Sequence, residues 1–250
     1  MDRVPKKAIL HIGTHKTGTT SFQHWLRIHR QRLSVEHGIN IYQGLFHNNR
    51  EIALLCADGS KQYPTMRRIT EWNTEPWQHR VRQHTLTEFN RSSQTLVISS
   101  ETLSFLRNPS ELSALAELLS EHEVSIVVTL RQRDEYLRSW AEHLMRDGFA
   151  LSDNPDSFAY VQPDSWLADY DSLLTAYRNQ FGQDSVHIVD YEAEMETHES
   201  VIPGIMKHIV ADTSNLPEWR GIFKNTSDQF SENRTSFLQR AIRRMMTRHK

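Results

Sequence analysis

Short apolar runs alternate with segments of helical periodicity along much of the chain. Each apolar run has the length of a buried strand, and the four runs are "KAILHIG" (7–13), "LVISSE" (96–101), "VSIVVTLR" (124–131) and "VHIVDYE" (186–192). Apolar residues recur at helical spacing in four further segments, 19–33, 110–122, 134–148 and 169–182. Strands that alternate with helices predict a parallel sheet with right-handed crossovers, so we expect an α/β fold.

Two regions depart from this alternation. Residues 45–92 contain short helical segments, two tryptophans and no clear strand, so we expect a helical insertion that lies over the sheet. Residues 149–166 are rich in Ser, Asp, Pro and aromatic residues, which suits a lid or an acceptor-binding loop. The chain has no repeat, low-complexity tract or linker, and we therefore expect one domain over residues 1–250.

The composition limits the possible partners and the compartment. With 29 Lys and Arg against 31 Asp and Glu, the chain gives no electrostatic reason to expect nucleic acid as a partner. The single cysteine, Cys56, excludes an intrachain disulfide and is compatible with a reducing compartment. The N-terminal segment lacks the apolar core of a signal peptide, and no apolar stretch approaches the ~20 residues that span a bilayer. We expect a cytoplasmic protein without a transmembrane segment.

The stretch "HIGTHKTGTTSFQHWL" has the outline of a phosphate-binding loop between a strand and a helix. Gly13 and Gly18 keep the four-residue gap of a nucleotide-binding P-loop, but Thr19 follows directly and Lys16 lies inside the gap. Backbone N–H groups of such a loop and of the helix that follows form an anion site, to which Thr19 and Thr20 add hydroxyls. Lys16 would lie over the anion, which suits a group that leaves from a phosphate. A plain Gly/Thr turn with a solvated lysine is the alternative.

The stretch "ILHIGTHKTGTTSFQ" resembles the 5′-phosphosulfate-binding loop of sulfotransferases that use PAPS (3′-phosphoadenosine 5′-phosphosulfate, the activated sulfate donor). It looks most similar to bacterial sulfotransferase-like proteins and to the Golgi carbohydrate branch. The resemblance implies a P-loop-type parallel sheet flanked by helices and no need for a metal. It also implies donor-binding roles for Thr14, His15, Lys16, Thr17, Gly18, Thr19 and Thr20.

A second donor-binding site is implied by "VVTLRQRDEYLRSWAEHL". In the family an arginine at the end of a central strand and a serine about eight residues later bind the 3′-phosphate, and Arg131 and Ser139 match this spacing. Arginine can bind a phosphate with two parallel hydrogen bonds, and serine adds a hydroxyl donor. Arg133 and Arg138 are alternatives to Arg131 that the sequence leaves open.

Two later segments resemble the family less specifically. "VHIVDYE" is similar to a strand that commonly ends in Tyr-Glu, here Tyr191 and Glu192. "FKNTSD" is similar to a late loop that closes over the adenosine diphosphate moiety, which makes Asn225 and Thr226 donor-binding candidates beside Lys224 and Ser227. The terminal "LQRAIRRMMTRHK" is predicted to form a basic helix.

Sulfuryl transfer also needs a base that takes the proton of the acceptor. Glu101 follows a strand predicted to lie beside the loop strand, at the edge of the sheet where ligands bind in parallel α/β folds. Glu101 and Phe105 resemble the "E-x-x-x-x-F" stretch that carries the catalytic glutamate of the Golgi branch, with three rather than four residues between them in this chain. The alternative for Glu101 is an acid in the first turn of a short helix. His15 is the second candidate for the base, and His47 and His143 are further histidines of interest.

These residues predict transfer of a sulfuryl group from PAPS to a hydroxyl, or to an amine, on a carbohydrate or a small metabolite, with 3′,5′-ADP as the second product. A P-loop kinase or NTPase is the first alternative, although Lys16 is displaced and "LVISSE" does not end in the Asp that would hold Mg²⁺. A catalytically inactive, nucleotide-binding protein of the same fold is the second alternative. Retention of Lys16, Glu101, Arg131 and Ser139 argues against it by motif alone.

Overall fold

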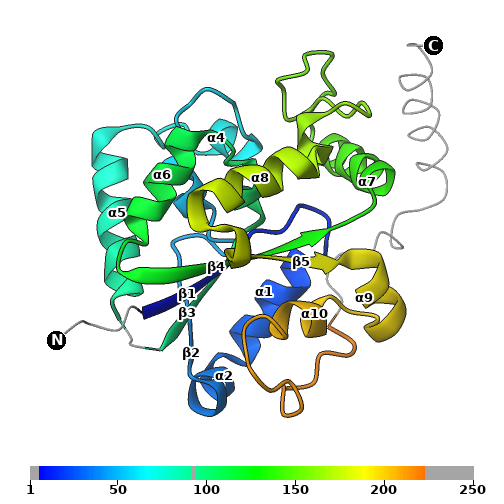
Figure 1. The fold of residues 1–250 in the computed structure, drawn as a ribbon. Helices are drawn as coiled ribbons and strands as arrows, with labels where there is room; N and C mark the ends of the chain where they lie inside the picture. The colour runs from blue at the N-terminus through cyan, green and yellow to red at the C-terminus, as the bar shows by residue number, and fades with distance from the viewer. Residues whose placement is uncertain (1–5, 92–93, 223–250) are drawn as a thin grey trace.

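The computed structural model describes residues 6–91 and 94–222 (Figure 1). The predicted donor-binding residues Asn225 and Thr226, their neighbours Lys224 and Ser227, and the basic terminal segment lie outside the described residues.

Five parallel strands form one sheet at the centre of the described chain. They are β1 (Lys6–His11), β2 (Ile39–Ile41), β3 (Thr95–Ser99), β4 (His122–Leu130) and β5 (Val186–Asp190). The strand order is β2-β3-β1-β4-β5, and every adjacent pair is parallel. The α/β class is therefore confirmed, and the four predicted strands are present. The short β2 has too few residues for a periodic pattern and was not predicted.

Helices cover both faces of the sheet (Figure 1). The α-helices are α1 (Thr19–Ile28), α2 (Arg30–His37), α3 (Arg50–Cys56), α4 (Pro64–Arg68), α5 (Glu75–Phe89), α6 (Pro109–Leu118), α7 (Arg133–Arg146), α8 (Tyr170–Phe181), α9 (Tyr191–His198) and α10 (Ile202–Met206). Three short 3₁₀ helices are η1 (Glu101–Phe105), η2 (Trp166–Ala168) and η3 (Gln183–Ser185). The helices α5, α6 and α8 lie on one face, and α1, α2 and α10 lie on the other.

Alternation along the strands explains the two layers of core. In β1, the buried side chains of Ala8 and Leu10 belong to the cluster under α5, α6 and α8, whereas Ile9 belongs to the cluster under α1 and α10. Because successive side chains of a strand point to opposite faces, a strand that is buried on both sides reads as a continuous apolar run. This is the pattern that made "KAILHIG" recognisable as a strand.

Three boundaries differ from the predicted ones. The segment 19–33 is two helices rather than one, because His29 has non-helical backbone angles (φ −101°, ψ 9°). Tyr191 and Glu192 begin α9 rather than end a strand, because the side chain of Asp190 accepts a hydrogen bond from Ala193 N at 2.9 Å and caps the helix. Strand β3 ends at Ser99, two residues before Glu101.

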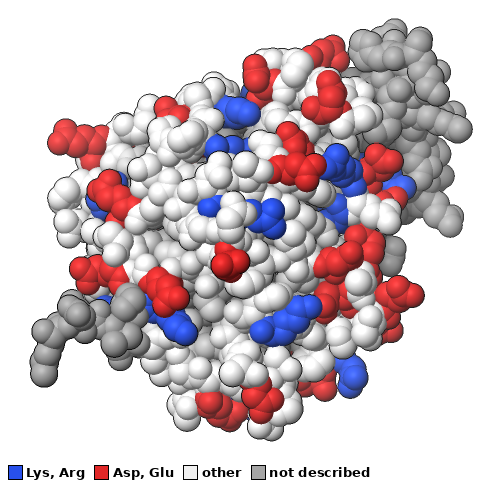
Figure 2. All heavy atoms as spheres, viewed as in Figure 1, with Lys and Arg blue, Asp and Glu red and all other residues white. Residues whose placement is uncertain are grey.

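The two irregular regions are as expected. The insertion between β2 and β3 is helical, with α3, α4 and α5. Residues 149–165 contain no helix or strand. In the described part of the chain, no helix is long and apolar enough to cross a membrane. On the face drawn in Figure 2, basic and acidic side chains are interspersed rather than separated by sign.

Candidate functional site

The predicted phosphate-binding loop follows β1 at the carboxyl edge of the sheet and leads into α1. Gly13 (φ 85°) and Gly18 (φ 79°) have positive φ, which glycine adopts at little cost, and Lys16 between them has φ 64°. Gly18 is the N-cap of α1, and no side chain caps the helix there. The first N–H groups of α1 lack intrahelical acceptors, and the helix dipole adds positive potential, so this end of α1 is suited to an anion.

Threonines fix the shape of the loop. Thr17 Oγ1 donates a hydrogen bond to Thr14 O at 2.6 Å, and Thr19 Oγ1 contacts the same oxygen at 3.4 Å. Thr14 N donates to Thr129 O of β4 at 2.8 Å, which ties the loop to the neighbouring strand. Thr20 is exposed, so its hydroxyl faces solvent, whereas the hydroxyl of Thr19 is directed into the loop.

The side chain of Lys16 is partly buried, unlike the solvated lysine of the alternative interpretation. Burial lowers the pKa of its ammonium group, and the nearby charges of Arg146 and Arg131 lower it further. Glu142 and Asp147 act in the opposite direction. Lys16 therefore lies against α7, among charges of both signs, rather than in open solvent.

Glu101 and the loop are in contact. A Cβ atom added to Gly13 would lie 2.9 Å from Glu101 Cβ, closer than real Cβ contacts come, so any side chain at position 13 would displace Glu101 or the loop. The contact exists because β3 pairs with β1 in parallel, so that both strands end at the same edge. The predicted position of Glu101 beside the loop is thus observed.

The carboxyl group of Glu101 accepts hydrogen bonds from two amides. Gln23 Nε2 donates to Oε2 at 3.1 Å, and Asn48 Nδ2 donates to Oε1 at 3.3 Å. Arg50 Nε donates to Asn48 Oδ1 at 2.8 Å and completes this network. Burial raises the pKa of Glu101, while the two amides and the charge of Arg50 oppose the rise. A raised pKa brings a carboxyl group closer to the range that suits a general base near neutral pH.

The hydrogen-bond network around Glu101 joins three segments, and the sequence gave no reason to expect that they meet. Gln23 is on α1, Asn48 precedes α3, and Glu101 begins η1. Glu101 is therefore also the first acid of a short helix, as the alternative expected, but its carboxyl oxygens are bound by α1 and the 48–50 segment. The sequence indicated His47 in the segment before α3 but gave no signal for the amide of Asn48 that follows it.

His15 is held between two aromatic rings. Its imidazole stacks on Phe105 with ring centroids 4.5 Å apart, and it meets Trp140 edge-on at 4.7 Å. Burial lowers the pKa of His15 to about 3, and the charges of His143 and Lys16 contribute. Nδ1 of His15 is buried and has no partner among the described residues. Such an imidazole is neutral at pH 7 but is a weak base, which favours Glu101 over His15 as the base.

His143 lies on the α7 side of the site. Burial lowers its pKa to about 4, against the opposing effect of Asp147, whose carboxylate is 3.8 Å away. Arg146 is within hydrogen-bond distance of its ring, at 3.0 Å. His47 is on the opposite side, where it lines a small cavity with Gln23.

Arg131 connects the two predicted phosphate sites. It directly follows β4, and its Nη1 donates a hydrogen bond to Lys16 O at 3.3 Å. Its guanidinium is also 3.5 Å from Glu135 and 3.8 Å from Glu192, and it lies over the ring of Tyr191 at 4.9 Å. The loop and the end of β4 are therefore joined by one side chain.

Ser139 lies on the face of α7 that is directed toward these groups. Glu135, four residues before it, contacts Arg131, and Glu142, three residues after it, acts on Lys16. Residues three and four apart on a helix share a face, so Ser139 lies between the two contacts. Of the alternatives, Arg133 pairs with Asp171 at 3.1 Å, and Arg138 pairs with Glu135, the carboxylate that also contacts Arg131.

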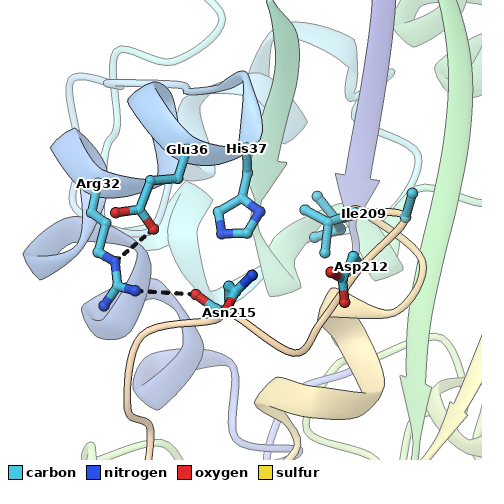
Figure 3. A pocket seen from close by; sticks show the side chains of 8 residues that line it. Arg32, Glu36, His37, Ile209, Asp212 and Asn215 are labelled. Carbon is cyan, nitrogen blue, oxygen red and sulfur yellow. Dashed lines mark hydrogen bonds and ion pairs between the residues drawn. The ribbon is translucent and has the colours of Figure 1, made fainter.

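A cavity of about 680 Å³ lies between α2 and the segment 209–215 (Figure 3). His37, just before β2, lines it together with Asp212, and Arg32 closes one side through Glu36 at 2.8 Å and Asn215 O at 3.2 Å. None of the predicted site residues lines this cavity. Among the described residues, no group of three or more His, Cys, Asp or Glu is arranged to hold a metal ion.

Comparison with solved structures finds sulfotransferases. A crystal structure of a sulfotransferase from Alicyclobacillus acidocaldarius aligns over 96% of this chain and 94% of its own, with a TM-score of 0.57 and 14% identity. A sulfotransferase domain from the curacin biosynthetic pathway gives a TM-score of 0.48 and 12% identity over 90% of this chain and 80% of that one. A mouse sulfotransferase complexed with PAP gives a TM-score of 0.37 and 15% identity over 95% and 65%.

No family model matches the sequence. No curated protein matches it either. The conclusion therefore rests on the first of the three structures and concerns the fold alone. With its five-stranded parallel sheet, its flanking helices and the loop at the carboxyl end of β1, the chain has the α/β fold of a sulfotransferase.

Proposed function

We propose that the protein is a PAPS-dependent sulfotransferase that transfers a sulfuryl group to a hydroxyl, or to an amine, on a carbohydrate or a small metabolite. The observation that carries the proposal is the meeting of three groups at one edge of the sheet. Lys16 lies in a loop suited to an anion, Glu101 is in contact with that loop through Gly13, and Arg131 binds the carbonyl oxygen of Lys16.

The donor has two anionic ends, and the chain offers a site for each. The N–H groups of the loop and of the first turn of α1 bind the 5′-phosphosulfate, together with the ammonium of Lys16. Arg131 and Ser139 bind the 3′-phosphate, for which a guanidinium is suited because it donates two parallel hydrogen bonds. Asn225 and Thr226 remain candidates for contact with the nucleotide.

The transfer is an in-line displacement at sulfur. Glu101 takes the proton of the acceptor hydroxyl while the acceptor oxygen attacks sulfur and forms the new S–O bond. The bond between sulfur and the bridging 5′-phosphate oxygen breaks, and its electron pair stays on that oxygen. Lys16 neutralises the negative charge that develops on this oxygen. This electrostatic contact stabilises the transition state and lowers the barrier.

His15 has a positioning role in this scheme. Its ring is held by Phe105 and Trp140, and its low pKa keeps it uncharged beside Lys16 at neutral pH. A neutral imidazole can donate one hydrogen bond to the donor without adding charge. A cytoplasmic location is part of the proposal and rests on the single cysteine, Cys56, which is buried.

Ligand-dependent thermal stability and PAPS turnover test the proposal together. A ligand that binds only the folded state stabilises it by RT ln(1 + [L]/Kd), about 2.7 kcal/mol at a hundredfold excess over Kd. We expect 3′,5′-ADP to raise Tm more than 5′-AMP and more than ATP with Mg²⁺, and labelled PAPS to release sulfate slowly when no acceptor is present.

The alternatives give different outcomes in the same experiment. A kinase or NTPase would be stabilised most by ATP with Mg²⁺ and would leave PAPS intact. An inactive protein of this fold would bind 3′,5′-ADP but release no sulfate from PAPS and sulfate no member of a panel of hydroxyl acceptors.

A further inference from the structure

A second, smaller cavity lies directly beside Glu101. It has a volume of about 250 Å³ and is lined by α1, the first residue of α2, the ends of β2 and β3 and the segment 42–49. The side chain of Gln23 lines the cavity on the side of Glu101. Its Nε2 donates hydrogen bonds to Glu101 Oε2 at 3.1 Å and to Ser99 O at 3.0 Å. A molecule in this cavity is therefore separated from the proposed base by one amide group.

The charged side chains that line the cavity are basic. Arg27, Arg30 and His47 line it, and none of its lining residues is Asp or Glu. Arg30 Nη1 donates to the neutral Gln43 Oε1 at 2.7 Å, so no carboxylate neutralises it there. Within the part of the chain that the structure describes, the side chain of Arg27 makes no hydrogen bond or ion pair. Two arginines without carboxylate partners are groups that bind an anion.

The remaining lining suits a polyhydroxylated molecule. The amide oxygens of Gln23 and Asn49 can accept from hydroxyl groups, and the amide nitrogen of Gln43 can donate to them. Phe46 offers an apolar ring. Typical small-molecule pockets have volumes of roughly 300–1,000 Å³, so this cavity is suited to one sugar-sized ring rather than to an extended chain.

We propose that this cavity binds the acceptor, and that the acceptor is a small polyhydroxylated compound that carries an anionic group. Arg27 and Arg30 hold the anionic group on the outer side, and this directs a hydroxyl of the ring past Gln23 toward Glu101. That the bound molecule is the acceptor of the sulfuryl group rests on the proposed function. The cavity, its charge and its position beside Glu101 do not depend on that function.

A pair of probes that differ in one carboxylate tests the proposal. Methyl β-D-glucuronide and methyl β-D-glucoside are titrated into the protein with 3′,5′-ADP present, and binding is measured by calorimetry. We expect the glucuronide to bind at least about tenfold more tightly, because a charge-assisted hydrogen bond exceeds a neutral one by roughly that factor. The variants Arg27→Gln and Arg30→Gln should each reduce the preference, and the double variant should abolish it.

Arg32→Gln is the matched control. Arg32 is an arginine of the adjacent helix α2 that pairs with Glu36 at 2.8 Å and does not line this cavity. Arg32→Gln should leave the preference for the glucuronide unchanged. Neither the single variants nor the double variant should change the affinity for 3′,5′-ADP. Equal affinity of the two probes, no binding of either, or a preference that survives in the double variant overturns the inference. Failure to bind 3′,5′-ADP or to turn over PAPS would instead overturn the proposed function.

Discussion

The two sides of the site are built in different ways. The proposed donor side consists of the loop 12–20, the end of β4 and the Ser139 face of α7, and backbone atoms take part in its contacts. Thr14 N donates to Thr129 O, and Arg131 donates to the carbonyl oxygen of Lys16. The proposed acceptor side consists of the cavity beside Glu101, which α1 and the segment 43–49 line, together with the neighbouring α4 and the loop 149–165, and side chains from separate segments hold it together.

Side-chain contacts dominate the acceptor side. Arg68 of α4 pairs with Asp147 at 2.8 Å, and the guanidinium of Arg67 lies over the ring of Phe158 at 5.1 Å. Trp140 Nε1 donates to Phe158 O at 2.8 Å and fixes the loop against α7. A site that depends on strand register and helix ends needs a few residues at fixed spacing, which form a motif. A site that depends on distant side chains needs no fixed spacing, and it leaves no motif.

Glu101 belongs to both sides, so its substitution should have the largest effect. We expect Glu101→Gln to lower the rate of sulfuryl transfer by ~10²–10⁴, the range for loss of a general base, with the affinity for 3′,5′-ADP nearly unchanged. Glutamine preserves the size of the side chain, so lost packing would not explain such a decrease. Radiolabelled PAPS serves for the rate and calorimetry for the affinity.

His15→Asn is the comparison for Glu101→Gln. If His15 only positions the donor, this variant should weaken donor binding more than it lowers the maximal rate. A normal rate in Glu101→Gln together with a large loss of rate in His15→Asn would move the base to His15. In that case, the acidic limit of kcat/KM should lie near pH 3, the pKa of His15, whereas Glu101 predicts a limit above its ordinary value of 4.5.

The sequence predicted how the secondary-structure elements of the proposed donor side are arranged. The strand before the loop, the helix after it and the neighbouring position of Glu101 follow from apolar runs and from the rule that parallel strands end at one edge. The helical insertion and the irregular 149–166 segment were also correctly placed. The weaker predictions concern ends of elements, such as Tyr191, which begins a helix because Asp190 can cap it.

The acceptor side could not be predicted in the same way. Asn48 and Gln23 bind the same carboxyl group although 25 positions separate them in the sequence. Their meeting depends on how α3 packs against η1 and on where the segment before α3 turns. The low pKa of His15 could not be predicted from the sequence either. Its decrease to about 3 requires burial, and the rings of Phe105 and Trp140 pack against the imidazole.

Substitution of Lys16 tests whether the positive charge of its ammonium group accelerates the transfer. We expect Lys16→Met to lower the rate by ~10²–10³, as for loss of one electrostatic contact to a transition state, while Tm stays close to the parent value. Methionine keeps most of the partly buried stem, so the change removes the ammonium with little loss of packing. Lys7→Met, at an exposed position of β1, is the control and should leave the rate unchanged. Near-normal turnover in Lys16→Met would assign the neutralising role to another cation of the site.

Arg131 tests whether the two phosphate sites of the donor side are coupled. We expect Arg131→Gln to weaken 3′,5′-ADP binding by about 1.5–3 kcal/mol and to leave 5′-AMP binding less affected, because only the first ligand has a 3′-phosphate. Calorimetry with both nucleotides measures the difference. Arg133→Gln, which removes an exposed ion pair with Asp171, is the matched control and should change neither affinity. An equal loss for both nucleotides would mean that Arg131 acts only through the loop.

The smallest expected effect concerns His11, which lies under the donor loop. Its Nδ1 is 2.9 Å from Ser99 Oγ and its Nε2 is 3.4 Å from Thr129 Oγ1, so it links β1 to both neighbouring strands. Burial lowers the pKa of His11 to about 3 from an ordinary value of 6.5. Between these two values the unfolded chain binds a proton at His11 that the folded protein does not bind. The free energy of unfolding therefore falls as the pH falls through this window, by up to about 1.4 kcal/mol per pH unit for this residue.

Removal of His11 should flatten that dependence. We expect His11→Gln to be less stable than the parent at pH 7, because buried hydrogen bonds are lost, but to lose less stability between pH 6.5 and pH 5. Urea unfolding at pH 7, 6 and 5 gives the slopes, and His79→Gln, at an exposed position of α5, should keep the parental slope. Because His11 joins the three strands that support the loop, a flattened slope would locate acid sensitivity in the donor side. Parallel slopes in parent and His11→Gln would show that the proton uptake on unfolding occurs at other groups.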